Sequence, residues 1–221
     1  MELFSSPMGG GVTPSEGAIA IARDKLTIDL HILVRPRAGD FLYSDEEIQL
    51  MLWDISAAKR LGANGVVFGV VNQDGSIDVE RTRELVAASR PMAVTFHRAS
   101  DACKDLSLAL NDLIACGVDR VLTSGGERSA MDGIKTIADL ARIGGDRIIV
   151  MAAGGIRPEN VRSIVEGSGV REIHAGLRSV GPSAMRYKNE KLSFGSGGDE
   201  YERLVVREHN VRDLIEQVNG L

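Results

Sequence analysis

Short apolar runs rich in β-branched residues alternate along the chain with longer segments whose apolar positions follow a helical period. Short runs of this kind are typical of strands, and turn-forming residues follow most of them. The pattern predicts seven strands, at residues 1–4, 28–35, 65–71, 92–98, 118–124, 147–153 and 170–175.

The segment 45–61 carries the clearest helix signals. Ser44 precedes it and Glu47 stands three residues later, which is the pattern of a capping box, and Gly62 follows the predicted end. The same period predicts further helices at residues 79–88, 106–115, 130–142, 158–166 and 200–218.

A strand followed by a helix, repeated without a linker or a low-complexity tract, is typical of a parallel sheet covered by helices. We therefore expect a single α/β domain over residues 1–221. Periodicity alone leaves two architectures open, a (β/α) barrel and an open doubly wound sheet.

Composition excludes several classes of function. The net charge is −5 and Lys and Arg form no cluster, so we expect no nucleic-acid partner. We expect no membrane association, because no apolar run reaches the ~18 residues of a membrane-spanning helix. The two cysteines make no disulfide framework, and the first residues lack the features of a signal peptide. These features predict a cytoplasmic protein with free thiols.

Candidate chemistry begins at TFHRASD, residues 95–101, where an apolar run ends in His97 and Arg98. Side chains alternate along a strand, so Thr95 and His97 share one face, while Val94 and Phe96 share the other. We expect the bulky face to meet the helices and His97 to point into the interior. Parallel α/β proteins bind ligands at the carboxyl ends of their strands, so the pattern predicts a site here.

The same alternation directs other ionisable side chains inward. Arg35 ends the run 28–35, His174 stands near the end of 170–175, and Glu2 lies in the run 1–4. We expect Glu2, Arg35, His97 and His174 to converge on one interior. His31 stands earlier in its run and is typical of a packed core histidine.

Six motifs stand in order along the chain: GGGVTPSEG (9–17), RPRAGDFLYSDEE (35–47), TFHRASD (95–101), VLTSGG (121–126), AAGGIRPEN (152–160) and MRY (185–187). Together they resemble the CutC family. The resemblance implies a TIM barrel, a cytoplasmic location, homo-oligomeric assembly and an association with copper homeostasis, with copper as the implied ligand.

One departure from the family changes the expected architecture. Members of the family begin with another strand and helix before the position that matches Glu2. The resemblance therefore implies an incomplete TIM (β/α) barrel with seven recognisable strands. Such a barrel has two edge strands, whose backbone donors and acceptors closure would otherwise pair.

The implied copper can be compared with the available ligands. Cu(I) prefers sulfur and Cu(II) suits imidazole, so the candidate metal ligands are His97, His174 and Cys103. Cys116 ends the following helix, roughly 17 Å from Cys103 at ~1.5 Å per residue, so the two thiols cannot bind one ion. Phe4 stands where the family commonly carries a cysteine. Small buried hydrophobes are the alternative interpretation of both cysteines.

A second hypothesis uses the same region for an anionic ligand. Gly154 and Gly155 directly follow a strand, and Pro158 stands near the first turn of a helix, so backbone N–H groups there can bind a phosphate or carboxylate. Ser124 in VLTSGG would add a hydroxyl, and Arg98 and Arg157 would add guanidinium groups. A tight turn is an equally good interpretation of the glycine pair.

This hypothesis predicts an enzyme that acts on a small anionic or phosphorylated metabolite. His97 or His174 would serve as acid or base, Glu2 or Asp101 would orient the imidazole, and Arg35 would clamp the anion. A structural ion pair is an equally good interpretation of Arg98 with Asp101.

Overall fold

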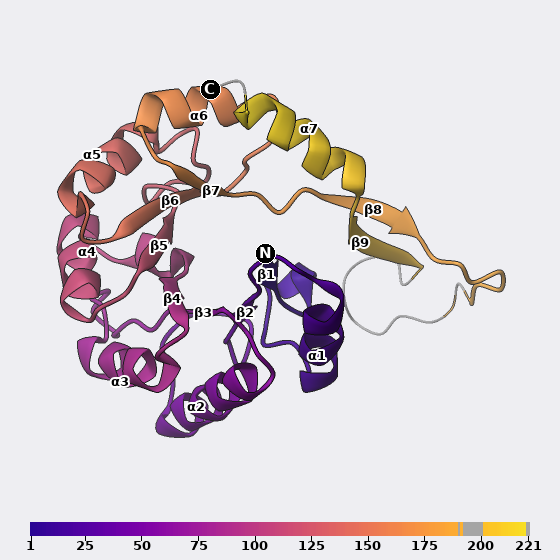
Figure 1. Cartoon of the computed structure of the whole chain (residues 1–221), viewed down its shortest axis with the longest axis horizontal. Helices are drawn as coiled ribbons and strands as arrows, with labels where there is room; N and C mark the ends of the chain where they lie inside the picture. Colours follow the sequence, from indigo (N-terminus) through magenta and orange to yellow (C-terminus); the bar gives the residue numbers. More distant parts are fainter. Residues whose placement is uncertain (190, 192–200, 220–221) are drawn as a thin grey trace.

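The computed structural model of the protein describes residues 1–189, 191 and 201–219. Seven parallel strands form one sheet, in which every strand pairs with the next one along the chain. Figure 1 shows the sheet curling into a half-barrel with the helices outside. The strands lie within the predicted ranges: β1 (Glu2–Leu3), β2 (His31–Leu33), β3 (Gly65–Phe68), β4 (Ala93–Phe96), β5 (Arg120–Thr123), β6 (Ile149–Ala153) and β7 (Glu172–His174).

Helices α1 to α6 each connect two successive strands of the sheet and cover its outer face, and α7 follows the last strand of the chain (Figure 1). They are α1 (Glu16–Lys25), α2 (Asp45–Arg60), α3 (Val79–Ser89), α4 (Leu106–Ala115), α5 (Ile134–Gly144), α6 (Val161–Ser168) and α7 (Glu208–Val218), with 3-10 helices η1 (Pro7–Gly9) and η2 (Arg98–Ala102). The capping box of α2 is confirmed. Ser44 Oγ accepts from the Glu47 N–H at 3.3 Å, and Glu47 Oε2 accepts from the Ser44 N–H at 2.9 Å.

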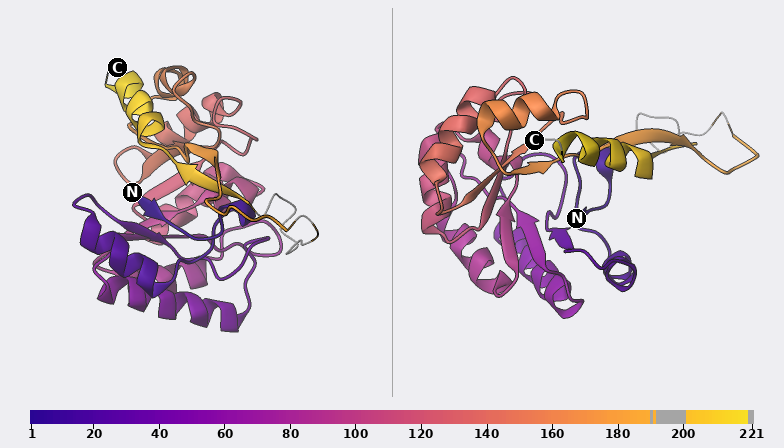
Figure 2. Two further views of the ribbon diagram at one scale, coloured as in Figure 1. Left: turned by 90° about the vertical axis from the view of Figure 1, so that its right-hand side faces the viewer. Right: turned by 45° about the horizontal axis from the view of Figure 1, so that its top comes forward.

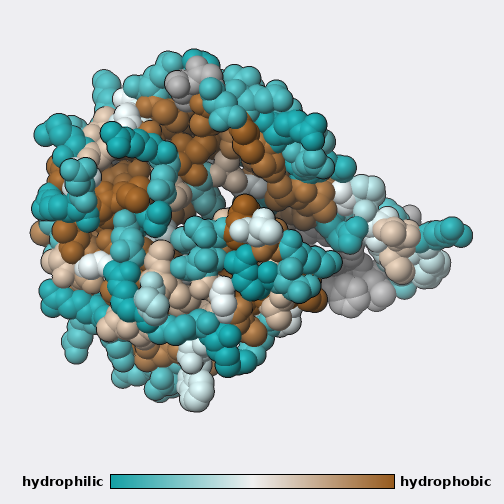
Figure 3. Space-filling view, viewed as in Figure 1, coloured by the Kyte–Doolittle hydropathy of each residue, from teal (hydrophilic) through white to brown (hydrophobic). Residues whose placement is uncertain are grey.

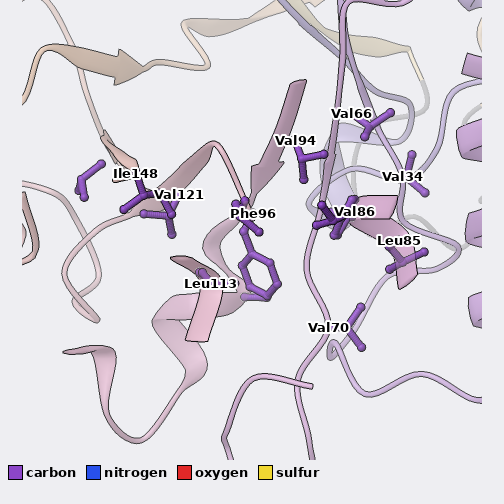
Figure 4. Close-up of a cluster of buried hydrophobic side chains, with 14 of the residues drawn as sticks. Val34, Val66, Val70, Leu85, Val86, Val94, Phe96, Leu113, Val121 and Ile148 are labelled. Atoms are coloured by element: carbon purple, nitrogen blue, oxygen red, sulfur yellow. The ribbon is translucent and has the colours of Figure 1, made fainter. Parts of the chain in front are cut away.

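The main core lies between the outer face of the sheet and the helices. Val94 and Phe96 of β4 are fully buried there, together with Leu85 of α3 and Leu113 of α4 (Figure 4). Burial of each such side chain contributes about 1.5–3 kcal/mol. Because Val94 and Phe96 occupy the helix side, alternation leaves Thr95 and His97 on the inner side, as predicted.

The barrel is open between its first and last strands. β1 pairs with β2 and β7 pairs with β6, and no pairing joins β1 to β7 within the described residues. The N-terminus lies beside this open edge (Figure 1). The expected incomplete barrel with two edge strands is therefore confirmed.

The prediction for residues 200–218 was partly wrong. Residues 202–206 form strand β9 (Glu202–Val206), which pairs antiparallel with β8 (Arg178–Pro182), and only the remainder forms α7; Glu200 lies outside the described residues. The hairpin extends away from the sheet in Figure 1 and in the right-hand view of Figure 2. Val205 and Val206 favour a strand, but the pairing depends on a partner segment distant in the chain.

Helix α1 was not predicted. Ala and Ile alternate along residues 18–22, which imitates the two-residue period of a strand, and Ile19 is the one residue of this helix that is buried. The helix has a conventional beginning nonetheless, because Ser15 Oγ accepts from the Ala18 N–H at 3.2 Å.

Candidate active site

A cavity of about 380 Å³ lies at the carboxyl ends of the strands. Strand ends supply its ionisable residues, and the loops after β2, β4 and β6 complete the wall. The four residues predicted to converge, Glu2, Arg35, His97 and His174, all line it. The remaining lining residues are Phe4, Gly10, Leu33, Phe41, Arg98, Leu122, Ala153, Gly154, Gly155, Ile156, Arg157, Gly176, Leu177 and Arg178. Figure 3 shows a hollow near the middle of the molecule, with apolar residues along its upper side and polar residues mainly below it.

Glu2 and His174 form a pair across the open edge of the barrel. The Glu2 Oε2 atom lies 3.7 Å from His174 Nδ1. Burial raises the pKa of Glu2 above its usual 4.5, and the nearby His174 and N-terminal ammonium oppose that effect. A carboxyl group with a raised pKa beside an imidazole is suited to moving a proton.

His97 is almost fully buried at the end of β4, with 8% of its surface exposed. Its Nδ1 accepts a hydrogen bond from the Ala99 N–H at 3.2 Å, and its buried Nε2 has no partner among the described residues. Burial, with the positive charge of Arg35 as a second cause, lowers the pKa of His97 to about 3. The ring is therefore neutral at ordinary pH.

Arg35 supports the loops around the pocket. Its guanidinium donates to the carbonyl oxygens of Gly9 at 3.1 Å, Gly11 at 2.9 Å and Gly39 at 2.6 Å. Its Nε is buried and has no partner in the described part of the chain. Arg35 therefore fixes the wall of the pocket and keeps one N–H group unused.

Asp101 contacts neither histidine in the described structure. It accepts hydrogen bonds from Thr123 Oγ1, from the N–H and hydroxyl of Ser124 and from the Gly126 N–H. Its Oδ2 also lies 2.7 Å from Arg98 Nε. The carboxylate thus ties the loop after β4 to the loop after β5, which is the structural interpretation of the Arg98–Asp101 pair.

Ser124 belongs to the same network rather than to the open cavity. Its hydroxyl is fully buried and accepts from Arg98 Nη2 at 2.6 Å. Two anchors therefore hold the Arg98 side chain, and the remaining terminal nitrogen, Nη1, lies against Gly154: a Cβ built on that glycine would come within 3.3 Å of it. This places Arg98 Nη1 beside the glycine turn.

The glycine turn after β6 has the backbone that an anion site needs. Gly154 and Gly155 have φ of +102° and +70°, a region that glycine adopts without strain. Within the described residues, the N–H groups of Gly154, Gly155 and Ile156 donate no hydrogen bond. Arg157, next in the chain, is exposed and lines the same pocket.

Two residues of the pocket escaped sequence reasoning. Arg178 stands at the start of β8, donates from Nη1 to the Pro7 carbonyl at 3.0 Å and lies 5.8 Å from the Phe4 ring centroid. Because the β8–β9 hairpin was not predicted, no signal directed this arginine to the pocket. The Phe41 ring is tilted against the His97 ring with centroids 4.8 Å apart, and an aromatic residue shortly after the RPRAG turn was the available signal.

A second cavity of about 260 Å³ lies inside the barrel toward the amino ends of the strands. His31 lines it, and the Arg120–Glu172 ion pair, with Nε and Oε2 2.9 Å apart, crosses it. His31 packs so closely on β3 that a Cβ on Gly65 would meet its ring. His31 is half-buried on the cavity wall, however, so it is not the core histidine expected from the sequence.

The cysteines do not join the pocket. Cys103 donates from Sγ to the Ala99 carbonyl at 3.9 Å, and Cys116 donates to the Val79 carbonyl at 3.7 Å. Burial, with Asp101 and two other carboxylates as further causes, raises the pKa of the Cys103 thiol to about 11. Neither thiol is disposed to supply the thiolate that Cu(I) prefers.

The donor set therefore does not fit a copper ion well. Among the described residues, no three His, Cys, Asp or Glu side chains are grouped closely enough to hold a metal. The candidate ligands His97, His174 and Cys103 thus do not form a shared cluster. His97 Nδ1 already accepts a hydrogen bond, which leaves the proton of the neutral ring on Nε2.

The fold and the pocket define a (β/α)-barrel protein with an arginine-rich pocket at the carboxyl ends of its strands. No helix in the described part of the chain combines the length and apolar character needed to cross a membrane. The CutC family profile matches residues 1–179, and the chain belongs to the CutC family, which is associated with copper homeostasis.

Three similar proteins illustrate the relationship. A family protein CutC of Mesorhizobium japonicum is 47% identical over 92% of this chain and 78% of its own length. The human "Copper homeostasis protein cutC homolog" is 43% identical over 97% of this chain and 79% of its own length. The crystal structure of the putative copper homeostasis protein CutC from Streptococcus agalactiae superposes with a TM-score of 0.75 at 32% identity, over 78% of this chain and 86% of that one.

Proposed function

We propose that the pocket binds a small anionic or phosphorylated metabolite and is the active site of an enzyme. The observation that carries this proposal is the charge of the wall. Four arginines line the described pocket, namely Arg35, Arg98, Arg157 and Arg178, against the single carboxylate of Glu2. A wall with this excess of positive charge attracts anions and repels metal cations.

The glycine turn supports the same ligand. Its three N–H groups have no partner among the described residues, Gly154 lies against Arg98 Nη1, and the turn precedes α6 by a few residues. Backbone N–H groups and guanidinium groups together bind a phosphate or a carboxylate with several charge-assisted hydrogen bonds. Because a side chain on Gly154 would press on Arg98 Nη1, glycine is also the residue that leaves room for the ligand.

Glu2 and His174 supply the chemistry in this proposal. They face each other at 3.7 Å on the wall of the same pocket, so the anion-binding groups would hold a ligand beside a proton acceptor. Reactions that move one proton on a bound metabolite need no more than this arrangement.

The test is calorimetric titration with inorganic phosphate at low ionic strength, repeated at high salt. We expect binding that weakens at high salt, and at least tenfold weaker binding in Arg157→Gln and in Gly154→Ala. Arg142→Gln is the matched control, because Arg142 is exposed on α5 and makes an ion pair with Asp139 away from the pocket. Equal phosphate affinity in all four proteins would contradict the proposal.

Copper is the second candidate ligand, and the names of the human and mouse relatives favour it. The predicted ligands are His97, His174 and Cys103, and the donor geometry described above argues against a high-affinity site. Elemental analysis of the purified protein and titration with Cu(I) and Cu(II) test this candidate. Stoichiometric copper that is lost in both His174→Ala and Cys103→Ser would favour it over the anion.

We further propose that the protein is a cytoplasmic homo-oligomer. Exposed apolar side chains on the hairpin support self-association: Val180, Met185, Tyr187 and Val206 are between 57% and 72% exposed. Figure 3 also shows apolar residues along the inner side of the arc that contains α7, and Val211 and Ile215 of that helix are exposed. Sedimentation equilibrium measures the oligomeric state, and a monomer at all concentrations would contradict it.

A further inference from the structure

His97 carries a fixed proton on one particular nitrogen. The Ala99 N–H donates to Nδ1, so Nδ1 is the acceptor of the neutral ring and Nε2 bears the hydrogen. That Nε2–H is buried and donates to no acceptor in the described structure. An unpaired buried donor is uncommon in proteins and destabilises the folded state, so its retention calls for an explanation.

The surroundings hold the ring in this orientation. Gly69 approaches it so closely that a Cβ there would lie 2.5 Å from Nδ1. Phe96 packs edge-on at 6.2 Å and Phe41 is tilted against the ring at 4.8 Å, measured between ring centroids. Phe96 is fully buried, whereas Phe41 is partly exposed, so Phe41 is the ring that can give way to a ligand.

A second unused donor lines the same pocket. The Nε of Arg35 is buried without a partner in the described residues, and the Arg35 guanidinium lies 5.0 Å from the Phe41 ring centroid. Phe41 thus contacts both residues that carry an unpaired N–H. The N–H groups of His97 Nε2 and Arg35 Nε both lack an acceptor within the described residues. They can donate hydrogen bonds to a carbonyl or anionic oxygen atom of a ligand.

The same pocket also contains a proton acceptor, because the Glu2–His174 pair lies on its wall. A donor directed at an oxygen and a carboxylate able to take a proton are the two groups that enolisation of a carbonyl compound requires. The chain carries both in one cavity of about 380 Å³.

Building on the proposed anion site, we propose that the pocket enolises a small carbonyl compound that carries a carboxylate or a phosphate. Glu2 removes a proton from the carbon next to the carbonyl. The electrons of the broken C–H bond form a C=C bond, and the π electrons of the C=O bond move to its oxygen. His97 Nε2–H donates to that oxygen and stabilises the enolate. The proton on Glu2 exchanges with solvent, and a solvent-derived proton then returns from Glu2 to the same carbon as the C=O bond re-forms, so no oxidant, reductant or co-reactant is consumed.

The experiment is hydrogen–deuterium exchange of two probes, pyruvate and dihydroxyacetone phosphate, followed by proton NMR with the full chain in D₂O. We expect exchange of the C–H protons of at least one probe above the protein-free rate. Glu2→Gln and His97→Phe are each expected to slow the protein-dependent exchange by about 10²-fold or more. His97→Gln retains an N–H donor and should recover part of the rate, and His209→Gln, an exposed position on α7, is the matched control.

Nitrogen-15 NMR of the His97 ring tests the proposal in the wild-type protein, so its result does not depend on whether a variant folds. We expect a bare Nδ1 and a protonated Nε2 from pH 5 to pH 8. The opposite tautomer, or protonation of both nitrogens in that range, would overturn the proposal.

Phosphate binding, measured on the same samples, separates this proposal from the one on which it rests. Absence of exchange with both probes while phosphate binds would overturn the enolisation and leave the anion site standing. Loss of both would overturn both proposals. Exchange that is equally fast in His97→Phe would overturn the assignment of His97.

Discussion

Glu2 and His174 lie 3.7 Å apart, Oε2 to Nδ1, although they belong to the first and last strands of the sheet and no backbone pairing joins those strands in the described structure. The pair therefore spans the open edge of the barrel by side chains alone. A carboxylate at this position is buried, and burial without full pairing destabilises its charged form.

The pH dependence of stability should report this carboxylate. Burial raises the pKa of Glu2 above 4.5 in the folded protein, so the folded state holds that proton more tightly than the unfolded state does. The resulting stabilisation is full below pH 4.5 and is lost as the pH rises through the folded-state pKa. We expect Glu2→Gln to raise the urea midpoint at pH 7.5 and to lose that advantage below pH 4.5.

A matched control isolates the effect of burial. Glu84 is exposed on α3, so Glu84→Gln should leave the midpoint unchanged at both pH values. A lower midpoint for Glu2→Gln at pH 7.5 would show that the interaction with His174 outweighs desolvation and would contradict the prediction.

Close packing of Gly69 on the His97 ring leads to a second prediction. A Cβ at residue 69 would lie 2.5 Å from His97 Nδ1 and 2.7 Å from the Ala99 Cβ. Gly69→Ala must therefore displace the ring and break its bond to the Ala99 N–H. We expect a loss of about 1–3 kcal/mol in the free energy of unfolding, measured by denaturant titration.

Gly17→Ala provides the control for this substitution. Gly17 lies in the first turn of α1, and a Cβ there meets Ser15 Oγ only at 4.0 Å. Because alanine is the better helix former, this variant should be equal to or more stable than wild type, by up to about 0.5–1 kcal/mol. If Gly69→Ala and Gly17→Ala changed the free energy of unfolding equally, displacement of the His97 ring would not destabilise the protein, and the prediction would be wrong.

The inward direction of His97 could be predicted from the sequence, because a strand's two-residue period places alternate side chains on opposite faces. Its protonation state could not, because that depends on a hydrogen bond from Ala99 and on the burial produced by Phe41 and Phe96. The same distinction applies to Arg178. Its place in the pocket follows from the β8–β9 pairing, which no local pattern specifies.

Asp101 shows why a motif can suggest the wrong partner. TFHRASD places it four residues after His97, but η2 turns its carboxylate toward the end of β5. Its partners Thr123 and Ser124 come from a strand that is adjacent only in the folded sheet. The role of Asp101 depends on the pairing of β4 with β5, which brings Thr123 to its carboxylate. The spacing of residues within TFHRASD does not specify that pairing.

Removal of this carboxylate should loosen two loops at once. Asp101→Ala leaves the Thr123 hydroxyl and the N–H groups of Ser124 and Gly126 without their acceptor, and we expect a loss of about 2–3 kcal/mol in the free energy of unfolding. Asp105→Ala is the control. Asp105 only caps α4 by accepting from the Leu108 N–H at 2.9 Å, so that change should cost about 1 kcal/mol. A smaller loss for Asp101→Ala than for Asp105→Ala would contradict the proposed role of the network.

Thiol reactivity should separate a structural cysteine from a copper ligand. Burial, with Asp101 as the second cause, raises the pKa of Cys103 to about 11, so at pH 7.5 on the order of one thiol in several thousand is ionised. Alkylation by iodoacetamide, measured in a Cys116→Ser background, should accelerate about tenfold per pH unit up to pH 10 and be fast in urea at pH 7.5. The Cys103 thiol donates a hydrogen bond to the Ala99 carbonyl and lies outside the pocket. Cys103→Ser should therefore bind as much copper as wild type. Fast alkylation of the folded protein at pH 7.5, together with lost copper in Cys103→Ser, would instead identify a thiolate held ready for a metal.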